Sequence, residues 1–114
     1  MPLQHPMPED VVELIARRFR VIGDPTRIKL LDQLREEELS VQELCDRVGS
    51  TQQNVSKHLG VLADAGIVAR RKDGNFTRYR VVDEGVYRLC EDVCGAMEQQ
   101  LAALQSVLRR ASGS

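Results

Sequence analysis

The sequence predicts a mainly helical α+β domain in which four helices are followed by a β-hairpin and one last helix, in the order α-α-α-α-β-β-α. Apolar residues recur every three or four positions in several segments, which is typical of amphipathic helices. The dipeptide Asp73-Gly74 separates two β-prone segments, a combination that favours a hairpin. The length of 114 residues suits one domain.

The two ends of the chain differ in composition from the part between them. Residues 1–8 carry closely spaced prolines and few apolar side chains, so they predict a flexible lead-in. Residues 111–114 are small and polar and predict a flexible tail, which leaves one domain over residues 9–110. No apolar segment is long enough to span a bilayer and no secretion signal is visible, so we expect a cytoplasmic protein with reduced cysteines and no membrane contact.

The first two helices are separated by a well-marked turn. The first is expected over roughly residues 9–22, and Gly23 ends it. Asp24 then serves as the N-cap of the second helix, with Pro25 at the first helical position, and this helix runs to about Arg35. The apolar stripe of the first helix consists of Val11, Val12, Ile15, Phe19 and Ile22.

Two short capped helices come next. Ser40 and Glu43 have the spacing of a capping box, which opens the first of them. Thr51 caps the second, which is expected over roughly residues 52–65. Two short helices joined at Gly49-Ser50 are typical of a helix-turn-helix, and the hairpin behind them makes the predicted fold a winged helix-turn-helix.

The last helix is expected over roughly residues 84–110, which corresponds to a length of about 40 Å at 1.5 Å per residue. That length exceeds what the core of so small a domain can cover. Part of the apolar stripe of this helix is therefore expected to meet a second copy of the chain, so that the terminal helices form a dimer interface. The stripe consists of Val86, Leu89, Cys90, Val93, Met97, Leu101, Leu104 and Leu108.

The helix over residues 52–65 combines an apolar inner face with an outer face suited to DNA. Val55, Leu59 and Leu62 share the inner face. On the outer face, glutamine and asparagine can read adenine edges in the major groove, while serine and lysine can contact bases or phosphates. A solvated helix face carries the same residue types, and that interpretation is the alternative. The candidate DNA contacts of this helix are Gln52, Gln53, Asn54, Ser56, Lys57 and His58.

Basic residues gather in the hairpin. Between Gly66 and Val81 there are five basic residues and one acidic residue, a net charge of +4 on a chain whose total is −1. Such a local patch suits phosphate contacts, and arginine at a hairpin tip is favoured in the minor groove. The alternative is a charged edge that resists aggregation. The candidate DNA contacts of the hairpin are Arg71, Lys72, Asn75 and Arg78.

In this order and spacing, four segments of the chain resemble the ArsR/SmtB family of repressors. Residues 23–28 (GDPTRI) resemble the start of the family's second helix, and residues 50–59 (STQQNVSKHL) look like its recognition helix. Residues 62–68 (LADAGIV) and 71–79 (RKDGNFTRY) resemble the helix exit and the wing, and the match covers roughly residues 10–110. The resemblance implies a homodimer, formed through the first and last helices, that releases its operator when a metal or other effector binds.

The three cysteines are the candidates for an effector site. Cys90 and Cys94 lie one helical turn apart, so two thiolates could bind a soft ion such as arsenite or Cd²⁺, with Cys45 or a group of the partner chain as third ligand. Family members commonly carry a thiol pair in the third helix or histidines in the last, whereas this chain has one thiol and no histidine there. The alternative is that these cysteines are small core hydrophobes.

No nucleophile-plus-base arrangement, phosphate loop or glycine fingerprint is present, so we do not expect an enzyme. The sequence predicts a sequence-specific repressor that binds a double-stranded DNA operator as a homodimer and is released by an effector. Two alternatives stay open. One is a winged-helix module that binds a protein partner, and the other is a DNA-binding repressor with no inducer site.

Overall fold

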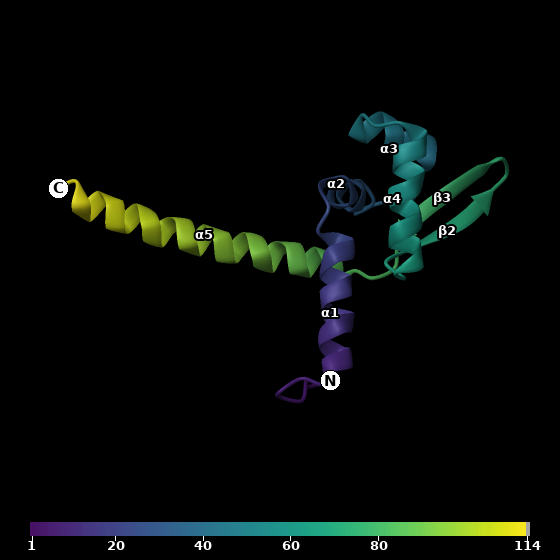
Figure 1. Cartoon of the computed structure of the whole chain (residues 1–114). Coiled ribbons are helices and arrows are strands. Elements are labelled where there is room, and N and C mark those ends of the chain that lie inside the picture. The colour runs from purple at the N-terminus through teal and green to yellow at the C-terminus, as the bar shows by residue number, and fades with distance from the viewer. Residues whose placement is uncertain (114) are drawn as a thin grey trace. The chain divides into compact units, whose positions relative to one another are not determined.

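The computed structural model describes residues 1–113, which form two compact units, residues 1–83 and the helix that follows. Each unit is described by itself. The elements of the first unit are α1 (Glu9–Ile22), α2 (Pro25–Gln33), β1 (Leu39–Ser40), α3 (Val41–Val48), α4 (Gln52–Asp64), β2 (Val68–Asp73) and β3 (Phe76–Val81), and the second unit holds α5 (Gly85–Ala111) (Figure 1). The predicted order of helices and hairpin strands is confirmed.

One element was not predicted, the two-residue strand β1. It pairs with β3 through Leu39↔Tyr79 and Ser40↔Arg78, so the hairpin becomes a three-stranded antiparallel sheet in the order β1-β3-β2. Two residues are too few to show the alternation by which a strand is recognised. Ser40 also carries the helix signal of the capping box, which masks its place in a strand.

The helix starts follow the predicted capping chemistry. The Asp24 carboxylate accepts hydrogen bonds from the backbone N–H groups of Thr26 and Arg27 at 2.9 and 3.2 Å. Ser40 and Glu43 form both bonds of the capping box at the start of α3, at 3.0 and 3.2 Å. These contacts satisfy N–H groups that have no partner within the helix, so the starts of α2 and α3 are encoded locally.

The two central residues of the hairpin turn are not the pair Asp73-Gly74 that predicted the turn from the sequence. Asp73 is still paired, opposite Phe76, and the two central residues are Gly74 and Asn75. Gly74 has a φ of 62°. Positive φ at the first central position is the requirement of a type II′ turn, which glycine meets without strain.

The core of the first unit is almost entirely aliphatic. On α4, the side chains of Val55, Leu59 and Leu62 are fully buried, which confirms the predicted inner face of this helix. Because the inner face is fixed by packing, the rotation of α4 about its axis is fixed as well. The fully buried side chains come from α2, β1, α3, α4 and the segment before β2, and they are Leu30, Leu39, Leu44, Val55, Leu59, Leu62 and Ile67.

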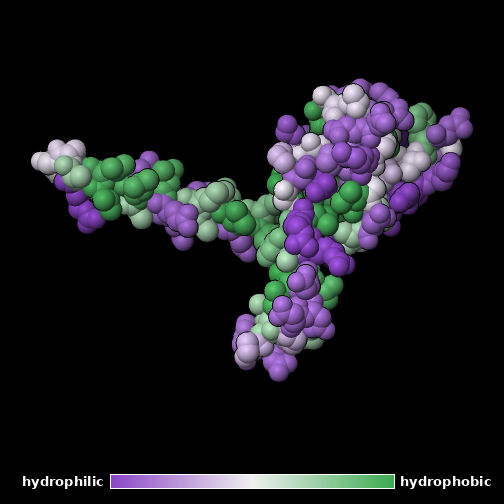
Figure 2. Space-filling model, viewed as in Figure 1, coloured by the Kyte–Doolittle hydropathy of each residue, from purple (hydrophilic) through white to green (hydrophobic). Residues whose placement is uncertain are grey.

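The second unit consists mainly of one 27-residue helix with an exposed apolar stripe, and Figure 2 shows apolar side chains along its length. Met97, Leu101 and Leu104 are each 55–56% exposed. The helix ends at Ala111, and Ser114, the last residue of the predicted tail, lies outside the described residues. Among residues 1–113, no helix combines the length and the apolar character needed to cross a bilayer.

Candidate nucleic-acid interface

The outer face of α4 is polar and open. Gln52, Gln53, Ser56 and Lys57 are exposed, as the sequence predicts. Asn54 is half-buried, and its amide donates a hydrogen bond to Ser50 Oγ at 2.9 Å. Asn54 thus also ties the start of α4 to the turn before it, while its neighbours on the outer face are free to meet a ligand.

The start of α4 lies beside the wing turn. A shallow groove is lined by residues from the starts of α3 and α4 and from the turn between β2 and β3. It brings together Gln52 and Asn75, two of the predicted contacts, although 22 residues lie between them in the sequence. A second hollow lies along the outer face of α4 itself, and its lining residues are Thr51, Gln53, Asn54 and Lys57.

His58, predicted to contact DNA from a flank of α4, is buried instead. Only 7% of this residue is exposed, and it shares the inner face with Val55, Leu59 and Leu62. The spacing of these four residues, at i, i+3, i+4 and i+7, is that of a helical stripe, so the sequence did carry a signal for burial. His58 is therefore no part of the interface that we propose below.

His58 instead belongs to a polar cluster that joins α4 to the end of α1. Its Nδ1 atom lies 3.1 Å from Nη1 of Arg27. The same guanidinium donates from Nε to the carbonyl of Val21 and from Nη2 to the carbonyl of Arg20, at 3.2 Å for the latter. Since a guanidinium only donates, Nδ1 must accept, which places the proton of the neutral ring on Nε2. One side chain thus caps α1 and holds α4.

Asp24 completes this cluster, 3.9 Å from His58 Nδ1. Burial alone would raise the pKa of its carboxyl, but the backbone N–H of Arg27 and the charge of that residue outweigh burial and hold the pKa below the ordinary value of 3.8. A carboxyl whose pKa is depressed by folding stabilises the fold when it is ionised. This contribution to stability is fully present when the pH is above the pKa of Asp24 in the unfolded chain. It is lost as the pH falls through the lower pKa that Asp24 has in the folded chain.

We therefore expect the free energy of unfolding to fall between about pH 5 and pH 3 less steeply in the Asp24→Asn variant than in the wild type. Asparagine caps a helix about as well as aspartate, so the stability of the two proteins at neutral pH should differ by no more than about 1 kcal/mol. Urea unfolding at neutral pH and across the range from about pH 5 to pH 3 measures both quantities. Equal pH dependence of the two proteins would contradict the role given to Asp24.

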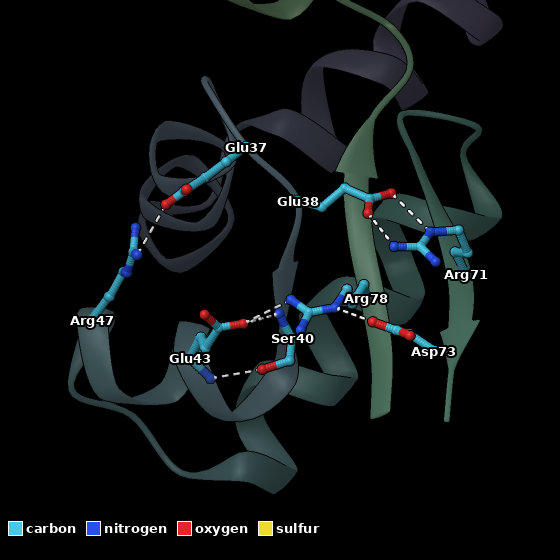
Figure 3. Close-up of polar contacts among 8 residues, drawn as sticks. All are labelled: Glu37, Glu38, Ser40, Glu43, Arg47, Arg71, Asp73 and Arg78. Carbon is cyan, nitrogen blue, oxygen red and sulfur yellow. Dashed lines mark hydrogen bonds and ion pairs between the residues drawn. The ribbon is translucent and has the colours of Figure 1, made fainter. Parts of the chain in front are cut away.

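Two arginines of the wing, Arg71 and Arg78, are held by carboxylates (Figure 3). Arg71 donates to both oxygens of Glu38, at 2.7 and 3.3 Å. Arg78 donates to Asp73 at 2.8 Å and to Glu43 at 3.2 Å. The hydrogen bonds from Arg71 and from Arg78 lower the pKa of Glu38 and of Asp73, respectively, so both carboxylates are charged at neutral pH.

Lys72, the other predicted cation of the wing, is exposed and has no carboxylate partner among residues 1–113. The same holds for Arg70, which is not one of the predicted contacts. The strand alternation carries the signal that was missed, because Arg70 and Lys72 share one face of β2 while Arg71 lies on the other.

The three cysteines do not form a metal centre within the described part of the chain. Cys45 is buried in α3, and burial, followed by the charge of Asp46, raises the pKa of its thiol. Cys90 and Cys94 are exposed on α5, and the Cys94 thiol lies 3.6 Å from Glu98 Oε1. No group of three or more histidine, cysteine, aspartate or glutamate side chains in residues 1–113 is placed to hold an ion.

The difference in burial leads to a prediction about thiol reactivity. Because the thiolate is the reactive form, we expect Cys45 to react with an aromatic disulfide reagent at least about tenfold more slowly than Cys94 at the same pH. In a Cys90→Ala background, which removes the other exposed thiol, the variants Cys45→Ala and Cys94→Ala assign the slow and the fast phase of the absorbance change. A fast phase that disappears in Cys45→Ala would show that α3 opens readily.

Comparisons with known proteins agree with this geometry. A helix-turn-helix domain family matches residues 22–71, which include α2, α3 and α4. The HTH-type transcriptional regulator KmtR of Mycobacterium tuberculosis is 40% identical over 87 residues, which cover 76% of this chain and 67% of KmtR. The HTH-type transcriptional repressor SmtB of the same organism is 32% identical over 87 residues, which cover 76% of this chain and 64% of SmtB. The chain belongs to the ArsR/SmtB family of winged helix-turn-helix transcriptional regulators.

A solved structure extends the match to nearly the full length of a relative. The crystal structure of Rv0081 from M. tuberculosis superimposes on this ArsR/SmtB-family regulator with a TM-score of 0.74 and 34% sequence identity, and the match covers 84% of this chain and 97% of Rv0081. The chain spans about two thirds of the length of KmtR and SmtB. The winged helix-turn-helix fold expected from the sequence is thus confirmed by the solved structures of similar proteins.

Proposed function

We propose that this regulator is a homodimeric repressor that binds a specific double-stranded DNA operator. The outer face of α4 lies in the major groove, and the turn of the wing, the β2–β3 hairpin, lies against the DNA backbone. The observation that carries this proposal is the division of α4 into two faces. One face is fully buried and fixes the helix, while the other presents Gln52, Gln53, Ser56 and Lys57.

The residue types on the outer face suit base reading. A glutamine amide can form two hydrogen bonds with the edge of an adenine, and a lysine can contact guanine or a phosphate. The groove that joins Gln52 to Asn75 supports simultaneous contact by α4 and by the wing turn. A helix in the major groove with an arm on the adjacent backbone gives both specificity and affinity, because base contacts specify and phosphate contacts position.

The dimer is supported by α5. Its side chains Met97, Leu101 and Leu104 are more than half exposed in the single chain, although they are large and apolar. A second copy that covers this stripe would remove the apolar surface from water. Two recognition helices on one dimer would match two half-sites of an operator.

The test is DNA binding by the double variant Gln53→Ala/Lys57→Ala, measured by fluorescence anisotropy on a duplex from the region upstream of the protein's own coding sequence. We expect about 100-fold weaker binding with an intact dimer, since each good base contact contributes about 1–3 kcal/mol. The matched control is Lys29→Ala/Gln33→Ala, which removes the same side chains from α2 and should leave binding unchanged. If both double variants bind like the wild type, α4 is merely exposed, and a module for protein partners becomes the better interpretation.

We also propose that an effector releases the operator through the exposed thiols Cys90 and Cys94. Thiolates prefer soft ions such as arsenite and Cd²⁺, and their spacing of one helical turn on α5 lets both face one ion. Gel shifts with and without arsenite, Cd²⁺, Zn²⁺ or an oxidant test this, with Cys90→Ser/Cys94→Ser as the control. Equal binding under every condition would remove the sensor from the proposal and leave a repressor without an inducer site.

A further inference from the structure

We propose that Arg71 and Arg78 are positioning residues of this repressor. They fasten the wing to the helix-turn-helix through Glu38 and Glu43, and they leave the phosphate contacts of the wing to Arg70 and Lys72. This inference rests on the proposed operator binding and changes the role that the sequence gives to two of the predicted contacts.

The strand register places the two arginines on the outer face of the sheet. Arg71 and Arg78 are directly opposite each other, and Ser40 of β1 is opposite Arg78. Residues opposite each other in an antiparallel sheet point to the same face. The adjacent rung, Leu39 and Tyr79, points to the other face and is buried at 1% and 7% exposure.

Two like charges directly opposite each other destabilise a sheet, but here each arginine has its own carboxylate partner. Arg71 forms a two-pronged pair with Glu38, the residue just before β1. Arg78 reaches across elements, from Asp73 at the end of β2 to Glu43 in the first turn of α3 (Figure 3). The arginines therefore connect both strands of the wing to the segment that starts the helix-turn-helix.

Glu43 makes this connection specific, because a single oxygen serves two partners. Its Oε1 atom accepts from the backbone N–H of Ser40 at 3.0 Å and from Arg78 Nη1 at 3.2 Å. The first bond is part of the capping box of α3. The contact of the wing and the cap of the helix thus share one carboxylate, so the two elements are oriented relative to each other.

The place of these contacts along the wing explains their effect. β1 pairs only with Tyr79 and Arg78, so residues 72–77 form a two-stranded extension without a third strand. Arg71 and Arg78 lie at the last rung that β1 supports. Exposed ion pairs add little to global stability, but pairs at the base of an extension limit the directions in which its turn can point.

Arg70 and Lys72 differ from Arg71 and Arg78 in their face of the sheet and in their pairing. Both lie on the face opposite to Arg71, and no ion pair of either is found among residues 1–113. A phosphate can approach these cations without displacing a carboxylate. Arg71 and Arg78 would first have to give up charge-assisted hydrogen bonds, which are roughly twice as strong as neutral ones.

Salt dependence separates the two roles. Each phosphate contact that is lost reduces the slope of log K against log salt by about 0.9. We expect this reduction in Lys72→Ala, whereas Arg71→Ala and Arg78→Ala should bind several-fold more weakly with the slope of the wild type. A slope reduced by about 0.9 in the arginine variants would overturn the inference while leaving the proposed operator binding intact. Circular dichroism and melting curves confirm that each variant is folded.

A charge swap provides rescue. Arg71→Glu and Glu38→Arg should each weaken operator binding, and the double variant Glu38→Arg/Arg71→Glu should return to within about threefold of the wild type if the pair only orients the wing, since a threefold change is less than 1 kcal/mol. A double variant that binds as weakly as Arg71→Glu alone would show that Arg71 touches the DNA.

The positioning role can also be measured without DNA. In the free protein, Glu38→Gln should increase amide hydrogen exchange in residues 72–77, because the wing then moves more freely. Asp46→Asn, which removes an exposed carboxylate from α3 outside this network, is the matched control and should leave the wing unchanged. Unchanged hydrogen exchange in Glu38→Gln would overturn the inference, whether or not the wild type binds an operator. Absence of operator binding by the wild type would instead refute the proposed function.

Discussion

The double variant Leu101→Glu/Leu104→Glu is expected to be monomeric and to bind operator DNA at least about 100-fold more weakly than the wild type. The two leucines are each 55% exposed on the apolar stripe of α5, where we place the second copy of the chain. Carboxylates buried without partners oppose association strongly. A monomer then binds a single half-site and loses the gain that comes from linking two binding events.

Sedimentation equilibrium gives the oligomeric state of this variant, and anisotropy gives its DNA affinity. The matched control, Gln99→Glu/Ser106→Glu, adds the same two charges to the opposite side of the helix and should remain a dimer. Circular dichroism checks that the helix content of the Leu101→Glu/Leu104→Glu variant is retained. If that variant stays dimeric at the concentration of the wild type, the stripe of α5 is not the interface between copies.

The second large effect is expected from Arg27→Ala, which should lower the free energy of unfolding by about 2–4 kcal/mol. The guanidinium donates to the carbonyls of Arg20 and Val21 and to Nδ1 of His58. His58 is 7% exposed, so its ring nitrogen would be left without a donor and largely out of reach of water. An unsatisfied buried acceptor loses its full hydration energy.

Urea unfolding at one fixed protein concentration measures this effect, since the stability of a dimer depends on concentration. Arg18→Ala is the matched control, because Arg18 pairs with Asp83 at 3.6 Å with both side chains more than 40% exposed. Exposed pairs of this kind contribute about 0–1 kcal/mol. If Arg27→Ala costs no more than Arg18→Ala, the cluster around His58 does not hold α4 in place.

Much of the fold could be predicted because its signals are local. The N-caps Asp24, Ser40 and Thr51 and the glycines that follow α1 and α3 each act within a few residues, and all were recognisable in the sequence. The buried face of α4 follows from the period of its leucines and valine. The order of elements then identifies the helix-turn-helix and the wing without knowledge of long-range contacts.

The parts that could not be predicted depend on partners far apart in the sequence. Arg27 and His58 are 31 residues apart, and Arg71 lies 33 residues from Glu38. No local pattern indicates which carboxylate will meet which arginine. The wing pairs require the strand β1, which is too short to be recognised, and without it Arg71 and Arg78 look like free cations. Periodicity alone indicated burial of His58, but not the arginine that makes its burial possible.

Ser40 has a consequence that goes beyond its own contacts. The same residue ends β1, faces Arg78 in the sheet and caps α3, so no hinge separates the strand that supports the wing from the first helix of the DNA-reading pair. The base of the wing and the first helix of that pair therefore move together. In the dimer that we propose, a change in the spacing or tilt between the two copies would carry each wing base along with its helices.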